Sequence, residues 1–358
     1  MRIATRRAAS AVQYAVQPSR LLDGARPLVQ PHHLRPRGVI DQMTGKPVQA
    51  TNDKLGVELP NVDLTQSEWD WDEIEALKQA SDEAGGILVF TNQRPEMTYH
   101  DQIRFVQAVA DHDNTVIEPH AVSAGLPDAP QLLEIVREAG ANVVFGENWH
   151  SDNSFHDETA SYSILRGAEV PRLGVNDTLF SSVEDAWDAL PQKKQDMLID
   201  LRVYHSANRA YGGGHSGNSR AAMEKTSSMR FRDHMPILER DVLQPLVTMH
   251  PRTRRLGLYA SPTFTTHVDG VSAEESKDIL NFVYQWFARP EFCTRVSWHP
   301  NQVVMWDNRS LSHKGVADDV RERRVVQRVT VRGSAPMDHR GQVCPRTKKQ
   351  AAEAGLFD

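Results

Sequence analysis

Apolar and polar positions alternate along the chain in two ways, one typical of helices and one typical of strands. The helical spacing comes first. Residues 68–84 place apolar side chains such as Ile74 and Leu77 at a spacing that puts them on one face of a helix. After a glycine pair, the apolar run at residues 87–90 predicts a short buried strand, and a second helix is expected over residues 98–110. This part of the chain therefore predicts a helix, a strand and a helix in succession.

Beyond residue 130 the apolar runs are short, and turn residues separate them. We expect strands at residues 132–136, 143–145, 161–165 and 179–183, and a last core strand at residues 325–332. The runs at residues 295–298 and 303–306 are joined by a turn and predict a β-hairpin. Short strands separated in this way favour an antiparallel β core.

Further helices and one loop complete the pattern. Residues 184–201 predict one or two helices interrupted at Pro191. A capping-box pattern at residues 272–275 begins a helix with one apolar stripe, which Pro290 ends. The glycine-rich residues 212–219 cannot pack a core and predict a mobile loop.

Composition excludes several classes of protein. Of 358 residues, 39% are hydrophobic and 25% are charged, which excludes a collagen-like, low-complexity or mostly disordered chain. The net charge of −6 argues against a nucleic-acid partner, whose binding surface would be basic. Two cysteines, Cys293 and Cys344, form no disulfide framework and favour a reducing, intracellular compartment. No apolar run approaches 18 residues, so no membrane-spanning segment is expected.

The N-terminus differs from the rest of the chain. Its first forty residues hold seven arginines and one acid, Asp23, a composition typical of organellar transit peptides and also compatible with a disordered extension. We expect an N-terminal extension over residues 1–50, a single domain over residues 51–335 and a C-terminal tail over residues 336–358. The location is then cytoplasmic, or mitochondrial if the extension is a transit peptide, and homo-oligomerisation is left open.

Three residues predict a metal centre. His150 and Asp152 are two positions apart, so on an extended backbone both side chains point to the same side. A single His-x-Asp pair more often forms ordinary hydrogen bonds than binds a metal. The same His-x-Asp pattern occurs again at His267 and Asp269. His313 follows a predicted strand 163 residues after His150, whereas only 46 residues separate His267 from it, too few for the intervening strands. Two histidines and one carboxylate are the ligands of non-haem Fe(II) oxygenases, whereas structural zinc takes four protein ligands.

Two arginines lie on one face of the last predicted strand. Arg324 and Arg328 are four residues apart, and the side-chain period of a strand is two. An arginine that points into a β core is costly unless it meets an anion. The pattern alone leaves open whether this face is interior or lies outward on an edge strand.

Together these residues resemble the Fe(II)- and 2-oxoglutarate-dependent dioxygenases of the taurine dioxygenase and 2,4-dichlorophenoxyacetate dioxygenase family. The resemblance covers residues 54–334. Its motifs are the segment at residues 55–64, Asn148-Trp-His-Ser-Asp152 with Phe155, Asp177-Thr178, Trp306-Asp-Asn308 with His313, and Arg324 and Arg328 at 11 and 15 residues beyond His313. Val175-Asn176 replaces the paired glycines of the family, which changes the local turn expected before Thr178.

The resemblance implies the fold, the metal ligands and the residues that bind the cosubstrate. The fold is mostly β with flanking helices (α+β), built on a double-stranded β-helix (jelly-roll, cupin-like) core. His150, Asp152 and His313 would hold Fe(II), beside which 2-oxoglutarate and O2 react to give succinate and CO2. Arg324, assisted by Thr178, would bind the C5 carboxylate of 2-oxoglutarate, a pairing that suits the guanidinium fork.

The resemblance also indicates the substrate. Arg328 would meet a sulfonate or carboxylate of a small anionic substrate, and His120 is a second candidate for that anion, with a water-exposed loop histidine as its alternative. The expected reaction is hydroxylation, followed by cleavage where the carbon bears a sulfonate or an aryl ether oxygen. Three alternatives are a biosynthetic hydroxylase or desaturase of a larger metabolite, a non-catalytic cupin-like binding protein, and a zinc hydrolase using the same three ligands.

Overall fold

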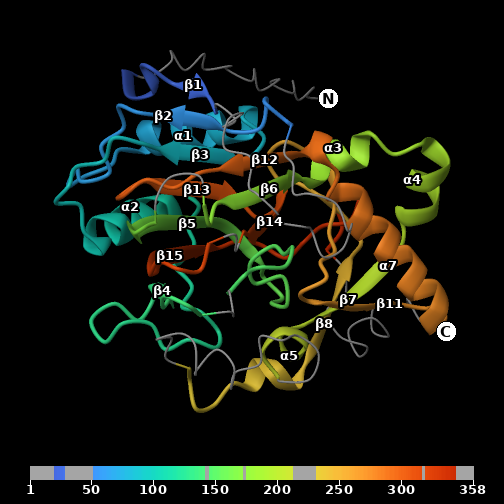
Figure 1. Ribbon diagram of the computed structural model, residues 1–358. Coiled ribbons are helices and arrows are strands. Elements are labelled where there is room, and N and C mark those ends of the chain that lie inside the picture. The colour runs from blue at the N-terminus through green and yellow to red at the C-terminus, as the bar shows by residue number, and fades with distance from the viewer. Residues whose placement is uncertain are drawn as a thin grey trace, which may run out of the picture.

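The computed structural model describes residues 20–28, 51–141, 145–171, 175–212, 231–316 and 319–343. One large sheet contains β1 (Arg26–Pro27), β2 (Val57–Leu59), β3 (Ile87–Phe90), β4 (Leu133–Arg137), β5 (Ala160–Glu169), β13 (Val303–Asp307) and β15 (Arg324–Arg332). Its strand order is β1-β2-β3-β13-β5-β15-β4 (Figure 1). β2 pairs with β3 in parallel, and the other pairs of this sheet are antiparallel.

A smaller sheet faces the large one across a shared core. It contains β6 (Thr178–Ser182), β12 (Cys293–Val296) and β14 (Leu311–Gly315) in the order β12-β6-β14. Phe180 and Leu311 of the small sheet pack against Val304, Trp306 and Val326 of the large one. Two largely antiparallel sheets joined by one apolar core are the architecture of a jelly roll.

Two helices cover the other face of the large sheet. They are α1 (Trp71–Glu83), which begins at a capping box on Asp70, and α2 (Tyr99–His112). On β3, Ile87 and Val89 point into the core between the sheets, while Leu88 and Phe90 pack under these helices. Because both faces of β3 are buried, its sequence is a continuous apolar run. The predicted succession of helix, strand and helix is confirmed.

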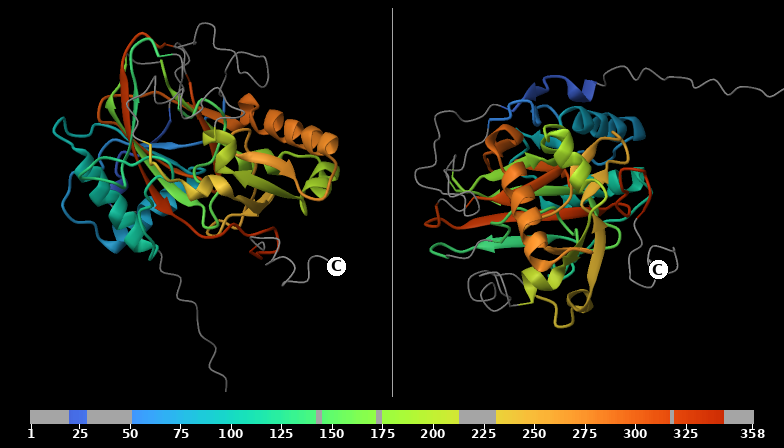
Figure 2. Two further views of the ribbon diagram at one scale, coloured as in Figure 1. Left: turned by 90° about the horizontal axis from the view of Figure 1, so that it is seen from below. Right: turned by 90° about the vertical axis from the view of Figure 1, so that its right-hand side faces the viewer.

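The remaining elements lie beside the smaller sheet (Figure 2). The strands are β7 (Arg202–Ser206), β8 (Asp241–Pro245), β9 (Val247–Met249), β10 (Leu256–Leu258) and β11 (Thr265–Val268), and the helices are α3 (Val183–Asp188), α4 (Gln192–Leu198), α5 (Ala207–Tyr211) and α7 (Ala273–Phe287). Of the short 3-10 turns, η2 (Pro236–Glu239) and η3 (Pro290–Phe292) belong to this region, whereas η1 (Arg20–Leu22) packs beside α1. The predicted break at Pro191 is confirmed between α3 and α4, and α7 begins at the predicted cap, Ser272.

The predicted hairpin is wrong. β12 pairs with β6, whereas β13 pairs with β3 and β5, so residues 297–302 cross from the small sheet to the large one. Gln302 Nε2 donates to Ser297 O at 2.8 Å and closes this crossing. A turn signal is local and does not reveal which strand each flanking run pairs with, because strand pairing is decided by distant residues.

Several predictions concern residues that are not described. Outside the described residues lie residues 143 and 144 of one expected strand, residues 213–219 of the expected loop, and most of the N-terminal extension. The division into extension, domain and tail therefore stays a prediction. Within the described ranges, no helix has the length and apolar character needed to cross a membrane.

We expect the buried His205 to make the stability of the fold depend on pH. Its Nδ1 lies 2.9 Å from Ser154 Oγ, and burial lowers the pKa of His205 to about 4. Below about pH 6.5 the unfolded chain binds a proton that the folded protein excludes, so the free energy of unfolding should fall as the pH drops toward 4. We expect His205→Gln to weaken this dependence in denaturant titrations and His267→Gln, at an exposed position, to preserve it. Identical pH profiles for wild type and His205→Gln would contradict the prediction.

Candidate active site

Backbone pairing brings the two predicted histidine ligands together. His313 lies on β14, and it forms an antiparallel bridge with His150. The His150 N–H donates to His313 O at 2.9 Å, and the His313 N–H donates to His150 O at 2.8 Å. Two residues that are far apart in the sequence are therefore held as direct neighbours by reciprocal hydrogen bonds.

Asp152 completes a group of three buried side chains. Its Oδ1 lies 3.7 Å from His150 Nε2, and its Oδ2 lies 3.8 Å from His313 Nε2. The two imidazole rings are 4.2 Å apart between centroids. One potential ligand atom from each of the three residues lies within 4.8 Å of the others. The sequence-predicted triad is therefore assembled in space.

The protonation of these groups suits a divalent cation. His150 Nδ1 lies 2.8 Å from Asn148 O and donates to it, so the lone pair of Nε2 faces Asp152. Burial lowers the pKa of His150 and, more strongly, that of His313, which keeps both rings neutral. Burial opposes ionisation of Asp152, but the charged Arg328 guanidinium outweighs it and holds the pKa of that carboxyl well below its usual range. Two nitrogen lone pairs and one carboxylate fit Fe(II).

A second His and Asp group, formed by Asp82, His250 and Asp307, has its ligand atoms otherwise engaged. His250 Nδ1 accepts two backbone N–H groups, and its Nε2 lies 3.1 Å from Asp307 Oδ2. Arg309 donates to both oxygens of Asp307, and Arg252 Nε donates to Asp82 at 2.7 Å. Both ring nitrogens of His250 are therefore occupied, which leaves this group no nitrogen lone pair for a metal.

Arg324 is a half-buried cation whose Nε is shielded from solvent and has no hydrogen-bond partner among the described residues. Its guanidinium carbon lies 5.7 Å from the ring centroid of Trp298, and Trp298 Nε1 donates to Thr178 Oγ1 at 3.1 Å. Burial and then the nearby Arg137 lower the pKa of Arg324 to about 10, so the guanidinium stays charged at neutral pH. A partly buried charge with an unpartnered N–H donor fits an anionic ligand.

Arg328 lies on the interior face of β15. This strand pairs with β4 on one side and β5 on the other, so the alternative of an outward face on an edge strand is wrong. Arg328 is 5% exposed, and its Nη1 donates to Asp152 Oδ1. The arginine predicted to meet the substrate therefore lies against Asp152, one of the three predicted ligands.

His120 is 6% exposed, so the alternative of a loop histidine in water is wrong. Its Nδ1 accepts the backbone N–H groups of Val122 and Ser123 at 3.4 and 3.1 Å, which places its proton on Nε2. Burial and then Arg328 lower the pKa of His120 to about 3. His120 is therefore a neutral N–H donor near Arg328.

Aromatic side chains near the triad were missed by the sequence analysis. The ring of Phe264 lies 5.9 Å from that of His150, and Tyr211 lies 5.9 Å from His120 and 6.0 Å from Phe264, as centroid distances. Nothing in the sequence distinguished these residues from ordinary core aromatics. His267, the competing ligand candidate, is exposed and stacks on Tyr204 instead.

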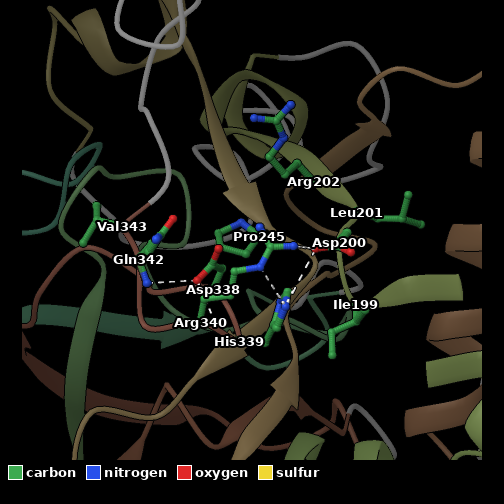
Figure 3. Close-up of a pocket in the computed structure, with 10 residues that line it drawn as sticks. All are labelled: Ile199, Asp200, Leu201, Arg202, Pro245, Asp338, His339, Arg340, Gln342 and Val343. Atoms are coloured by element: carbon green, nitrogen blue, oxygen red, sulfur yellow. Dashed lines mark hydrogen bonds and ion pairs between the residues drawn. The ribbon is translucent and has the colours of Figure 1, made fainter. Parts of the chain in front are cut away.

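A cavity of about 340 Å³ lies apart from these residues (Figure 3). Residues 199–202, Pro245, residues 338–340 and residues 342–343 line it. Its Arg340 is already engaged by Asp200 and by His339, whose Nε2 lies 3.2 Å from Arg340 Nε. The cavity contains none of the residues predicted to carry chemistry.

Comparison with known proteins supplies independent evidence. The family model described as "Taurine catabolism dioxygenase TauD, TfdA family" matches residues 44–330. The chain is 31% identical over 202 residues to the alkylsulfatase of Acinetobacter baylyi, covering 56% of this chain and 61% of that protein, so it spans less than two thirds of this relative. It is 35% identical over 247 residues to the alpha-ketoglutarate-dependent 2,4-dichlorophenoxyacetate dioxygenase of Cupriavidus pinatubonensis, covering 68% of this chain and 75% of that one.

A solved structure also matches. The crystal structure of a taurine dioxygenase from Burkholderia xenovorans aligns with a TM-score of 0.65 and 24% identity, covering 86% of this chain and 98% of that one. This likeness confirms the predicted jelly-roll core.

Proposed function

The chain belongs to the TauD, TfdA family of taurine catabolism dioxygenases, and we propose that it is a 2-oxoglutarate-dependent non-haem iron dioxygenase. The observation that carries the proposal is the buried group of His150, Asp152 and His313, whose lone pairs converge within 4.8 Å. Fe(II) held there would supply the oxidation of substrate carbon by O2, coupled to conversion of 2-oxoglutarate to succinate and CO2.

Arg324 and Thr178 would bind the cosubstrate. The Arg324 guanidinium offers N–H donors to the C5 carboxylate of 2-oxoglutarate, and the Thr178 hydroxyl, which accepts from Trp298, has its own proton to donate. Bidentate pairing would orient the cosubstrate in a way that a lysine ammonium does not. Thr178 is buried and Arg324 Nε is shielded from solvent, and partial exclusion of water strengthens such a pairing.

Arg328 and His120 would bind the anionic group of the substrate. Arg328 supplies positive charge and His120 a neutral donor, and both are buried close to Asp152. The named activities of the two relatives above concern sulfate esters and an aryloxyacetate, which are anions. We therefore propose a small sulfonate, sulfate ester or carboxylate, whose hydroxylated product falls apart where the attacked carbon bears the sulfonate sulfur, the sulfate ester oxygen or an aryl ether oxygen.

The test is iron-dependent succinate formation from 2-oxoglutarate, measured with a panel of alkylsulfonates, alkyl sulfates, aryloxyalkanoates and amino acids. Stimulation by one anionic class supports the proposal. Absence of succinate with every compound would favour the binding protein or the zinc hydrolase, and stimulation only by a large neutral metabolite would favour the biosynthetic hydroxylase or desaturase.

Replacing Arg328 by methionine tests the substrate site. Because His120 shares the substrate anion, we expect a loss of about 1.5 kcal/mol, which lowers substrate-coupled turnover roughly tenfold and leaves slow, uncoupled 2-oxoglutarate decarboxylation. Succinate and oxidised product are measured together, so that uncoupling appears as a fall in their ratio. Normal coupling in Arg328→Met would refute this role.

A further inference from the structure

Two buried side chains, Ser163 and Asn308, form hydrogen bonds to Asp152. Ser163, on β5, donates its hydroxyl to Asp152 Oδ2 at 2.7 Å, and Asn308 Nδ2 donates to Ser163 Oγ at 3.0 Å. Asn308 Oδ1 accepts the backbone N–H of Asp152 and the indole N–H of Trp306, each at 3.1 Å. These four residues are at most 3% exposed, so the contacts are made without competing solvent.

The directions of these hydrogen bonds are determined by the network. The Asn308 oxygen faces two N–H donors, so its amide nitrogen faces Ser163. The Ser163 oxygen accepts from that amide, and its single proton is therefore directed to Asp152. One contact fixes the backbone of Asp152 and the other fixes its carboxylate, which removes the rotation that the side chain would otherwise have.

We propose that Ser163 and Asn308 are positioning residues that set the carboxylate of Asp152 for a divalent cation. The inference rests on the proposed function, because it assigns a partner to one of the proposed ligands. Ser163 donates to Oδ2 and Arg328 donates to Oδ1, so the carboxylate of Asp152 is held in one orientation beside His150 and His313. Partners of this kind typically contribute 10- to 100-fold to metal affinity.

Ser312 offers a matched control on β14. It is 2% exposed and directly precedes His313, yet its Oγ has no hydrogen-bond partner among the described residues. A serine-to-alanine change at position 312 thus alters the same chemistry at the same depth, next to a proposed ligand, without touching Asp152.

The experiment is calorimetric titration of the full chain with Mn(II), without 2-oxoglutarate, so that binding is read independently of turnover. We expect Ser163→Ala to weaken binding about 10- to 100-fold and Ser312→Ala to change it by less than about twofold, with both circular dichroism spectra unchanged. Ser163→Cys, which keeps only a weak donor, carries the same test if the alanine variant does not fold. Wild-type Mn(II) affinity in a folded Ser163 variant would overturn the inference.

Asp152→Ala separates this inference from the proposed function. One outcome is that wild type binds Mn(II), Asp152→Ala does not bind it, and Ser163→Ala binds it with wild-type affinity. In that case the proposed metal site stands, and only the positioning role of Ser163 fails. If wild type does not bind Mn(II), or Asp152→Ala binds it equally well, the proposed metal site itself fails, and the inference fails with it.

Discussion

His313→Ala is expected to abolish conversion of 2-oxoglutarate while the protein remains folded. His313 is one of the three side chains whose donor atoms converge, and the backbone bridge to His150 persists in the variant because it uses main-chain atoms. Loss of one of three ligands should lower the rate at least about 10³-fold, equivalent to roughly 4 kcal/mol in the barrier. The measurements are Fe(II)-dependent succinate formation and Mn(II) binding.

His267→Ala is the control for this experiment. His267 belongs to the competing His-x-Asp pair, but it is exposed and stacks on Tyr204, and its Asp269 is bound by Arg202 at 3.3 Å. We expect this variant to retain wild-type turnover and metal binding. Full activity in His313→Ala, or a loss of metal binding in His267→Ala, would contradict the ligand assignment.

Arg324→Ala is expected to raise the 2-oxoglutarate requirement about 30- to 150-fold. Losing a charge-assisted bidentate contact to the C5 carboxylate costs about 2–3 kcal/mol of binding. The measurement is the KM for 2-oxoglutarate at saturating iron, together with direct binding of the cosubstrate. Arg324→Lys should recover part of the affinity through its charge but not the geometry of the fork.

Arg323→Ala provides the matched comparison, because Arg323 is adjacent in sequence but lies at the surface, where it pairs with Glu138 and Glu169. Surface ion pairs contribute little, so we expect its KM to stay close to that of wild type. An unchanged KM in Arg324→Ala would transfer the carboxylate-binding role to Arg328 or to another cation.

Much of the fold follows from local patterns. The runs at β3 and β15 and the periodic stripes of α1, α2 and α7 were all predicted close to their observed bounds, because side-chain period depends on neighbouring residues. The hairpin at residues 295–306 failed because its two strands belong to different sheets. A turn signal contains no information about which distant strand completes the pairing.

The sequence by itself determined the residue types and spacings of the candidate site, including His150, Asp152 and His313, since its motifs identify the family. Only the tertiary structure decided that the Arg324 and Arg328 face is interior, because Val326 on the same side of the strand packs in the core between the two sheets. It also decided the tautomer of His120 and the contact of Ser163 with Asp152. These features depend on burial and on hydrogen bonds between residues distant in the chain, and neither quantity is encoded in the local order of side chains.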